Sequence, residues 1–188
     1  RAVAIGKAAP AMLAGAFGSL DGQLERALLI TKHGHLQGRE FPRSEILEAA
    51  HPVPDASSLA AGARLLEFLA AAPADIHWLF LISGGASSLV EVLPEGVSLA
   101  GVQRVNAWLL ASGLPIERMN ALRRRVSRIK GGRLREYLGG RPARVLLISD
   151  VPGDDPANIG SGLLHAATDA ETLPDQLPSW LLALVHPV

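Results

Sequence analysis

The sequence is poor in several residue types, and each shortage narrows what the protein can do. Its 188 residues include no cysteine, which excludes disulfide bonds, thiolate metal sites and thiol catalysis. Aromatic residues make up only 4% of the chain, so few side chains could stack on nucleic-acid bases. No apolar run approaches the roughly 18 residues that cross a bilayer, and the first residues lack the regions of a signal peptide. We therefore expect no membrane span and a cytoplasmic location.

Neither sign of charge is in excess. Lys and Arg number 18 and Asp and Glu number 18, which argues against nucleic acid or an anionic membrane as a partner. Within the cations, 15 are arginine and only three are lysine, namely Lys7, Lys32 and Lys130. Each lysine lies beside or close to a glycine, where a compact ammonium can meet a phosphate and a ligand can approach the backbone. We interpret the three as candidate phosphate-binding groups, the alternative being solvated lysines retained by chance.

The chain is 48% hydrophobic and 19% charged, which is typical of a compact globular protein. Short apolar runs predict buried strands at 3–5, 26–31, 78–82 and 144–149. Between and after them, mostly helical stretches are predicted at 8–17, 57–71, 98–111, 115–137 and 178–185, with an interruption of 115–137 at Gly131-Gly132. This alternation predicts an α/β fold with a mainly parallel sheet.

Polar or glycine-rich residues follow every predicted strand. Because the carboxyl ends of parallel strands lie at one edge of a sheet, these segments should meet in a single ligand site. The segments are Gly6-Lys7, 32–35, 83–85 and 150–155.

The segment 83–88, Ser-Gly-Gly-Ala-Ser-Ser, is a candidate anion-binding loop. It follows a predicted strand and precedes a short helical piece, whose backbone N–H groups favour anions. Ser83 and Ser87 could add hydroxyl donors. The loop matches neither the Walker A nor the G-x-G-x-x-G pattern, and a tight turn with a serine cap is the alternative.

One face of the predicted helix at 115–137 carries Arg123, Ser127 and Lys130 at helical spacing. Two cations and a hydroxyl beside the buried stripe would suit a phosphorylated ligand. On the loop after the last predicted strand, Asp150 and Asp154 could hold Mg²⁺ or accept a hydroxyl proton, the alternative being turn capping. The six histidines do not form a metal-ligand set, and no G-x-S-x-G nucleophile motif occurs.

Taken together, these motifs resemble the glycerate 2-kinase family, the MOFRL-associated or tartrate-operon hydroxypyruvate reductase-like proteins. The resemblance runs in order from Ala4 to about Gly162. Its strings are Gly6-Lys7-Ala8-Ala9 to Met12, Thr31 to His35, His51 to Asp55, Ile82 to Gly85, Leu122-Arg123 through Ser127, Ile129 to Gly132, and Leu147 to Pro156.

The resemblance implies a three-layer Rossmann-like α/β domain and a smaller C-terminal domain, with the active site between them. It implies transfer of a phosphoryl group from ATP, with Mg²⁺, to D-glycerate, giving 2-phosphoglycerate. Catalytic roles then fall to Lys7, Asp150 and Arg123, with Asp150 and Asp154 as metal ligands. The substrate would meet His51 and Asp55. Cofactor binding would use Lys32, Ser83, Gly84, Gly85, Ser87, Lys130 and Gly131.

The sequence departs from the family pattern at Ala86, Arg124-Arg125 and Leu163-Leu164. We expect residues 1–188 to form the N-terminal, MOFRL-associated domain of a longer two-domain protein. An NAD(P)H-dependent hydroxypyruvate reductase is an alternative, although the missing G-x-G-x-x-G pattern counts against it. A degenerate, non-catalytic binding domain is another. Assembly as a homodimer is left open.

Overall fold

A computed structural model of the chain describes residues 1–20, 22–36, 38–166, 173–174 and 176–185. Its centre is a five-stranded sheet in which all neighbouring strands are parallel, in the order β3-β2-β1-β4-β5. The predicted α/β fold with a mainly parallel sheet is therefore confirmed. The strands are β1 (Ala2–Ile5), β2 (Ala27–Lys32), β3 (Ser44–Ala49), β4 (Trp78–Ser83) and β5 (Ala143–Ile148).

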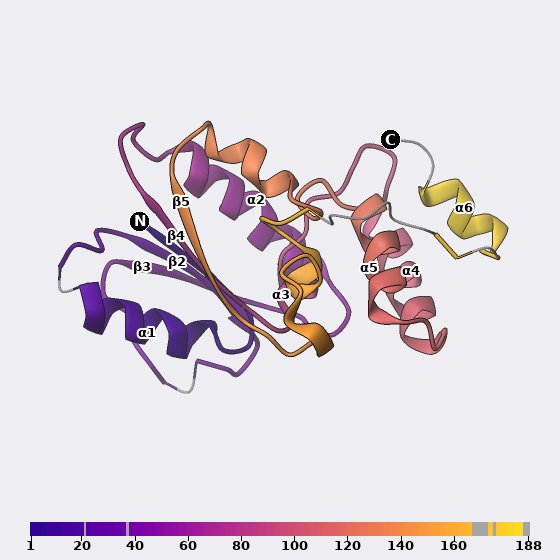
Figure 1. The fold of residues 1–188 in the computed structure, drawn as a ribbon, viewed down its shortest axis with the longest axis horizontal. Helices are drawn as coiled ribbons and strands as arrows, with labels where there is room; N and C mark the ends of the chain where they lie inside the picture. Colours follow the sequence, from indigo (N-terminus) through magenta and orange to yellow (C-terminus); the bar gives the residue numbers. More distant parts are fainter. Residues whose placement is uncertain (21, 37, 167–172, 175, 186–188) are drawn as a thin grey trace.

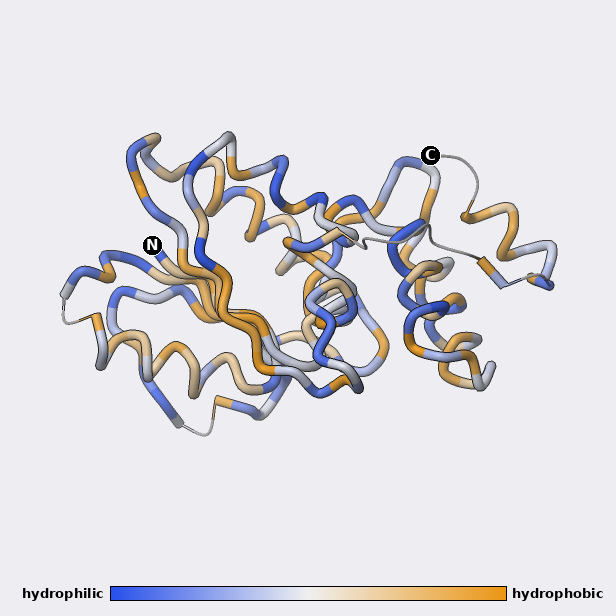
Figure 2. Tube along the Cα trace, viewed as in Figure 1, coloured by the Kyte–Doolittle hydropathy of each residue, from blue (hydrophilic) through white to orange (hydrophobic). Residues whose placement is uncertain are grey.

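Helices cover both faces of this sheet, so the domain has three layers (Figure 1). Helix α1 (Ala9–Leu20) packs on one face through Leu13, and its apolar cluster includes Leu29 and Leu81. The other face carries α2 (Ala56–Ala70), α3 (Ala86–Leu89) and the 3-10 helix η1 (Arg133–Leu138). The strands are the most hydrophobic part of the chain in Figure 2, because a parallel sheet buried on both faces needs apolar side chains on both.

A separate group of helices lies beyond the carboxyl ends of the strands, at the right in Figure 1. Its apolar cluster includes Val105 and Leu109, Leu122 and Leu181. None of the described helices has the length and apolar character needed to cross a membrane. The group consists of α4 (Leu99–Ala111), α5 (Ile116–Arg125) and α6 (Ser179–Val185). Two short 3-10 turns precede α6 in the chain, namely η2 (Pro152–Asp154) and η3 (Ile159–Ser161).

Strand β3 is an element that the sequence reasoning missed. Its residues include two glutamates and one serine, and most of its side chains are half-buried because it is an edge strand. Glu45 on β3 accepts two hydrogen bonds from the guanidinium of Arg64 on α2, at 2.5 and 2.7 Å. An edge strand that pairs its outer side chains with a helix has no continuous apolar run to reveal it.

The helix predicted at 115–137 is wrong beyond Arg125. Helix α5 ends there, and after a loop the chain continues as a 3-10 helix from Arg133. Val126, directly after the helix, has φ −107° and ψ 21°, outside the helical region. Gly131 and Gly132, with positive φ of 66° and 84°, then turn the chain into the 3-10 helix. The face expected to carry Arg123, Ser127 and Lys130 together therefore does not form.

Asp55 caps helix α2. Its carboxylate accepts from the backbone N–H groups of Ser57 and Ser58, and the Ser58 hydroxyl accepts from the Asp55 N–H, completing a capping box. The Ser57 hydroxyl also donates to this carboxylate, and these hydrogen bonds lower the pKa of Asp55 below its usual value.

We expect Asp55→Ala to lower the free energy of unfolding by about 1 kcal/mol at neutral pH, because two helix N–H groups lose their acceptor. Asp55→Asn keeps an oxygen acceptor and should cost much less. Because the folded pKa is lowered, the contribution of Asp55 is present at neutral pH and is lost as the pH falls through that lowered pKa. Urea unfolding of the three proteins at neutral and acidic pH measures this, and equal stability of wild type and Asp55→Ala at pH 7 would contradict the capping role.

Candidate functional site

The loops that follow β1 and β4 meet where the strand order of the sheet reverses. The chain leaves β1 toward β2 on one side, whereas β4 lies on the other side of β1. Crevices at such positions bind ligands in parallel α/β sheets. Hydrogen bonds join the two loops, from Lys7 N–H to the Gly84 carbonyl at 2.9 Å and from Ala8 N–H to the Ser83 hydroxyl at 3.0 Å. Ser83 is buried beneath this junction and serves to hold it together.

Lys7 and Asp150 form an ion pair above this junction. The Lys7 Nζ and Asp150 Oδ2 atoms are 3.5 Å apart, and the side chains are 40% and 48% exposed. Both groups are therefore accessible to a ligand. A Cβ placed on Gly84 would overlap the Asp150 carboxylate, so glycine at this position makes room for it. The predicted convergence of the loops after β1, β4 and β5 is thus what the structure shows.

His51 stands beside the same pair. A Cβ placed on Gly85 would lie 2.9 Å from the His51 Cδ2 atom and 3.2 Å from the Lys7 Cγ atom. Burial lowers the pKa of His51, and the positive charges of Lys7 and Lys32 lower it further, whereas Asp150 acts in the opposite sense. These effects favour the neutral form of the His51 imidazole, which can accept or donate a hydrogen bond without adding charge.

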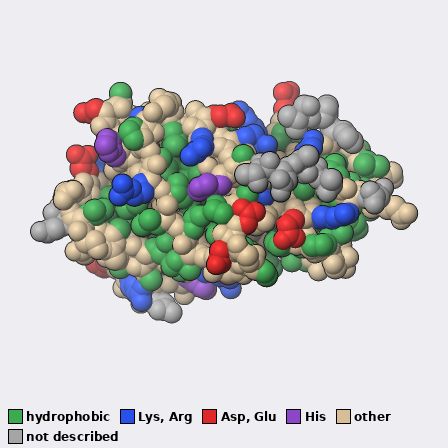
Figure 3. Space-filling model, viewed as in Figure 1, with side chains coloured by type: hydrophobic (Ala, Val, Ile, Leu, Met, Phe, Trp, Pro, Cys, Tyr) green, Lys and Arg blue, Asp and Glu red, His purple; other side chains and the backbone are tan. Residues whose placement is uncertain are grey.

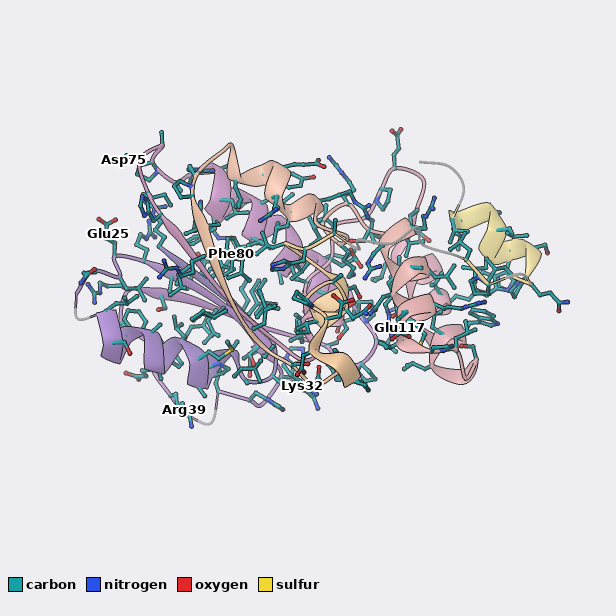
Figure 4. The ribbon with its side chains drawn as sticks, viewed as in Figure 1. Glu25, Lys32, Arg39, Asp75, Phe80 and Glu117 are labelled. Atoms are coloured by element: carbon teal, nitrogen blue, oxygen red, sulfur yellow. The ribbon has the colours of Figure 1, made fainter. Side chains whose placement is uncertain are left out.

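A pocket of about 320 Å³ opens between this edge of the sheet and helices α4 and α5. Its sheet-side wall consists of the ends of loops, and its other wall consists of helix side chains. Figure 4 shows Glu117 on α5 on the helical side and Lys32 at the carboxyl end of the sheet. The lining residues are His51, Pro52, Gly85, Ser87, Ser88, Asn106, Leu110, Ile116, Asn120, Arg123, Asp150, Val151, Asn158, Gly160 and Ser161.

Arg123 is the cation of the helical wall. Its Nε donates to Asn106 Oδ1 at 3.2 Å, and its Nη1 donates to Asn120 Oδ1 at 3.3 Å. Asn106 and Asn120 are themselves buried and fixed, by hydrogen bonds from their amide nitrogens to the carbonyls of Val102 and Asn158. Burial lowers the pKa of the Arg123 guanidinium, because no opposing charge compensates its loss of water.

Two serine hydroxyls link the walls of the pocket. The Ser87 and Ser161 oxygens are 2.8 Å apart, and Ser161 donates to Asn120 Oδ1, also at 2.8 Å. Ser87, predicted as a cofactor-binding residue, therefore does line the pocket, together with Gly85. Asn106, Asn120 and Ser161 were missed by the sequence reasoning. The sequence did contain a signal for Asn106, because this polar residue interrupts an apolar stripe on α4. The stripe consists of Val102, Val105 and Leu109.

Several predicted site residues lie elsewhere. Lys130 is buried, 2% exposed, and its ammonium contacts the equally buried carboxylate of Glu91. Gly131 donates its N–H to the Ser161 carbonyl and so contributes to packing of the chain behind the pocket. Asp154 is exposed and is not among the residues that line the pocket. The structure thus does not bring these three to the ligand-facing surface that Lys7 and Asp150 share.

Among the described residues, no group of three or more His, Asp or Glu side chains could hold a metal ion by itself. Asp150 is the carboxylate that lines the pocket, and Asp155 is occupied in accepting from the Ala157 N–H and the Asn158 amide. On the face shown in Figure 3, acidic and basic side chains are interspersed, in keeping with the balanced charge of the sequence.

Comparisons with known proteins found a family model and several relatives that match most of this chain. Residues 1–178 match a family described as a domain of unknown function, DUF4147. The chain is 40% identical over 175 residues to a D-glycerate 2-kinase of Thermotoga maritima, and 46% identical over 137 residues to a putative hydroxypyruvate reductase of Agrobacterium vitis. It superimposes on the crystal structure of a Thermotoga maritima glycerate kinase with a TM-score of 0.83 and 34% identity.

These matches cover most of the chain but less than half of each relative. They span 93% of this chain and 41% of the D-glycerate 2-kinase, and 72% of this chain and 34% of the putative reductase. The superposition covers 98% of this chain and 46% of the solved one.

Proposed function

The chain belongs to the DUF4147 family, and on this basis we propose that it is the nucleotide-handling domain of an ATP-dependent kinase that converts D-glycerate to 2-phosphoglycerate. Support comes from the relatives, since proteins named glycerate 2-kinase match most of the chain. A homodimer and a cytoplasmic location stay predictions from the sequence.

The observation that carries the proposal is the Lys7–Asp150 pair at the switch point of the sheet. Asp150 lines one wall of a pocket whose other wall holds Arg123, and Lys7 lies beside it. Phosphoryl transfer requires little covalent chemistry from the protein. It requires positioning of the two substrates and positive charge where the transferred group becomes more negative. An exposed lysine at a glycine-lined strand end, with a carboxylate 3.5 Å away, provides both.

In the proposed mechanism, bound ATP supplies the phosphoryl group. Lys7 binds and stabilises negative charge on the transferred group through its Nζ atom. Asp150, whose carboxylate is 3.5 Å from Lys7 Nζ, accepts the proton of the attacking hydroxyl or holds a metal ion. Gly84 and Gly85 let phosphates approach the loop closely, and Ser87 and Lys32 add a hydroxyl and a second ammonium.

Mg²⁺ fits the Asp150 carboxylate at this edge. In phosphoryl-transfer sites it is commonly held by one or two carboxylates together with substrate phosphates, rather than by an all-protein cage. Asp150 is exposed enough to serve, whereas Asp154, predicted as a second ligand, does not line the pocket. On the acceptor side, the neutral His51 would contact the substrate, whereas we assign Asp55 to helix capping.

We further propose that the chain is one domain of a two-domain enzyme, with the second domain closing over the carboxyl edge of the sheet. The support is that the matched part of each relative is less than half of its length. Tests of activity therefore need the complete protein that carries this chain.

One assay separates the kinase from the reductase. The complete protein is incubated with ATP, Mg²⁺ and D-glycerate, and 2-phosphoglycerate and ADP are measured; in parallel it receives NADH and hydroxypyruvate. Formation of ADP and 2-phosphoglycerate without NADH oxidation is the expected result. NADH oxidation without phosphoglycerate would overturn the proposal, and activity in neither arm would favour a non-catalytic binding domain.

Gly84→Ala should reduce turnover while leaving the fold intact. The added Cβ overlaps the Asp150 carboxylate, a flexible side-chain end that can move aside but then loses its place near Lys7. A displacement of about 1 Å in a catalytic group costs on the order of 100-fold in rate, so we expect kcat to fall by about that factor.

The control is another glycine-to-alanine change, Gly15→Ala inside helix α1, with no atom within 4 Å of the new Cβ. It should leave kcat unchanged and raise the melting temperature slightly. Equal kcat values for Gly84→Ala and wild type would show that Asp150 does not need its present position.

A further inference from the structure

Arg123 is a partly buried cation whose hydrogen bonds go only to neutral groups. Its Nε and Nη1 donate to the amide oxygens of Asn106 and Asn120, and no carboxylate lies within ion-pair distance of it in the described part of the chain. Its Nη2 makes no hydrogen bond to any described residue. Arginines removed from water are normally paired with a carboxylate or a phosphate.

The hydrogen-bond partners of Arg123 are themselves held in place by further hydrogen bonds. Asn106 and Asn120 are 7% and 1% exposed, and each also donates to a backbone carbonyl, which fixes the side of the amide that faces Arg123. Ser161, 1% exposed, donates to the same Asn120 oxygen. Two amides and a hydroxyl thus hold a guanidinium in one orientation at the pocket without neutralising its charge.

The two walls of the pocket differ in what they offer. The wall at the sheet edge has Asp150 and Gly85, with Lys7 paired to Asp150 next to it, the arrangement that suits the phosphates of a nucleotide. The wall of α4 and α5 has Arg123 with apolar neighbours Leu110 and Ile116. A planar guanidinium with free donors matches a carboxylate, and this wall lies across the pocket from the group that would accept the hydroxyl proton.

We propose that Arg123, positioned by Asn106 and Asn120, binds the carboxylate of the acceptor substrate and makes the enzyme specific for small hydroxy acids over uncharged polyols. The inference rests on the proposed kinase function and deepens it by assigning the acceptor end of the pocket. Arg123 then acts mainly in substrate binding, so its removal should raise the KM for D-glycerate far more than it lowers kcat for the bound substrate.

The first test measures binding of D-glycerate, glycerol and a non-hydrolysable ATP analogue by calorimetry, with each acceptor titrated in the presence and absence of the analogue. In Arg123→Gln of the complete protein, D-glycerate affinity should fall by about 100-fold, in the range found when one partner of a buried charge pair is removed. Affinities for glycerol and the ATP analogue should change by less than about threefold, since neither depends on this cation.

Arg125→Gln is the matched control, because Arg125 lies on the same helix but is not among the residues that line the pocket. It should bind D-glycerate as the wild type does. If Arg123→Gln instead weakens the ATP analogue and spares D-glycerate, Arg123 belongs to a phosphate subsite and the proposal is overturned. Unchanged affinities for all three ligands would overturn it as well.

A second variant separates binding from a structural role. Asn106→Asp places a carboxylate where Arg123 Nε now meets an amide oxygen, so the cation gains an internal ion pair. We expect D-glycerate affinity to fall as far as in Arg123→Gln, while the melting temperature stays at or above that of Arg123→Gln. Wild-type affinity for D-glycerate in Asn106→Asp would contradict the proposal.

The experiments distinguish failure of the carboxylate site from failure of the kinase proposal. If the wild-type protein binds D-glycerate in an Arg123-dependent way but forms no phosphorylated product, the carboxylate site stands and the kinase proposal fails. If it phosphorylates D-glycerate and Arg123→Gln keeps the wild-type KM, the kinase proposal stands and the carboxylate site fails.

Discussion

The Lys7→Met variant is expected to lose phosphoryl transfer to D-glycerate by about 1000-fold in kcat, or more. Removing one preorganised donor from a developing negative charge costs on the order of 10² to 10³ in rate, and a cation at a transferred phosphoryl group can contribute more. Methionine keeps most of the length and apolar stem of lysine, so the change removes the charge and little else.

This loss should occur without loss of stability. The Lys7–Asp150 pair is 40% and 48% exposed, and exposed pairs contribute about 0–1 kcal/mol to folding. Lys7→Arg separates charge from shape: it keeps the cation but not the compact ammonium, and should recover only part of the activity. Steady-state kinetics of the complete protein together with thermal unfolding measure both quantities.

Asp150→Asn completes the experiment, because Lys7 and Asp150 should act as a unit. The double variant should then be little slower than the worse of the two single variants, since their effects are not additive. A Lys7→Met enzyme with wild-type kcat would remove Lys7 from the mechanism, and loss of folding in that variant would assign it a structural role instead.

The largest effect on stability is expected at Lys130 and Glu91. Both side chains are 2% exposed and contact each other, joining the segment after α3 to the loop after α5. Burial lowers the pKa of Lys130, and the negative charge of Glu91 opposes that shift. Removing one partner leaves an uncompensated buried charge, which costs about 3–5 kcal/mol. Lys130→Met and Glu91→Gln should each lower the free energy of unfolding by that amount in urea titrations.

The double variant Lys130→Met with Glu91→Gln should recover most of the loss, because it leaves no buried charge at this position. Arg64→Met is the control, since its partner Glu45 is partly exposed and the expected cost is below about 1 kcal/mol. Wild-type stability in Lys130→Met would mean that the Glu91 carboxylate is not left as an uncompensated buried charge. The ion pair would then have no structural role, and the assignment of Lys130 to the fold would be wrong.

The sequence predicted those strands that a short run of neighbouring apolar residues reveals. Strands β1, β2, β4 and β5 follow from short apolar runs, and parallel strands necessarily bring the residues after them to one edge. For that reason, the placement of Lys7 near Asp150 could be predicted from the sequence. The resemblance to the glycerate 2-kinase family was predicted from motif order, and the similarity to proteins of that name confirms it.

What could not be predicted depends on contacts between distant segments. Lys130 has the sequence context of a phosphate ligand, but its role depends on Glu91, 39 positions earlier, which has no motif of its own. Likewise, Asn106 and Asn120 are ordinary helix residues until α4 and α5 bring both amides against Arg123. The helical period that would place Arg123, Ser127 and Lys130 on one face ends at Arg125, so spacing alone could not place Lys130.

The central position of β1 has a consequence for how the domain forms during synthesis. One edge of β1 can pair with β2 early, but its other edge waits for β4, which follows β3 and α2 along the chain. Until then, an apolar strand presents unpaired N–H and C=O groups. Parallel pairings over such separations form slowly, and partly made chains of this kind are prone to aggregate. The ligand crevice between β1 and β4 is therefore among the last features to be completed as the chain emerges.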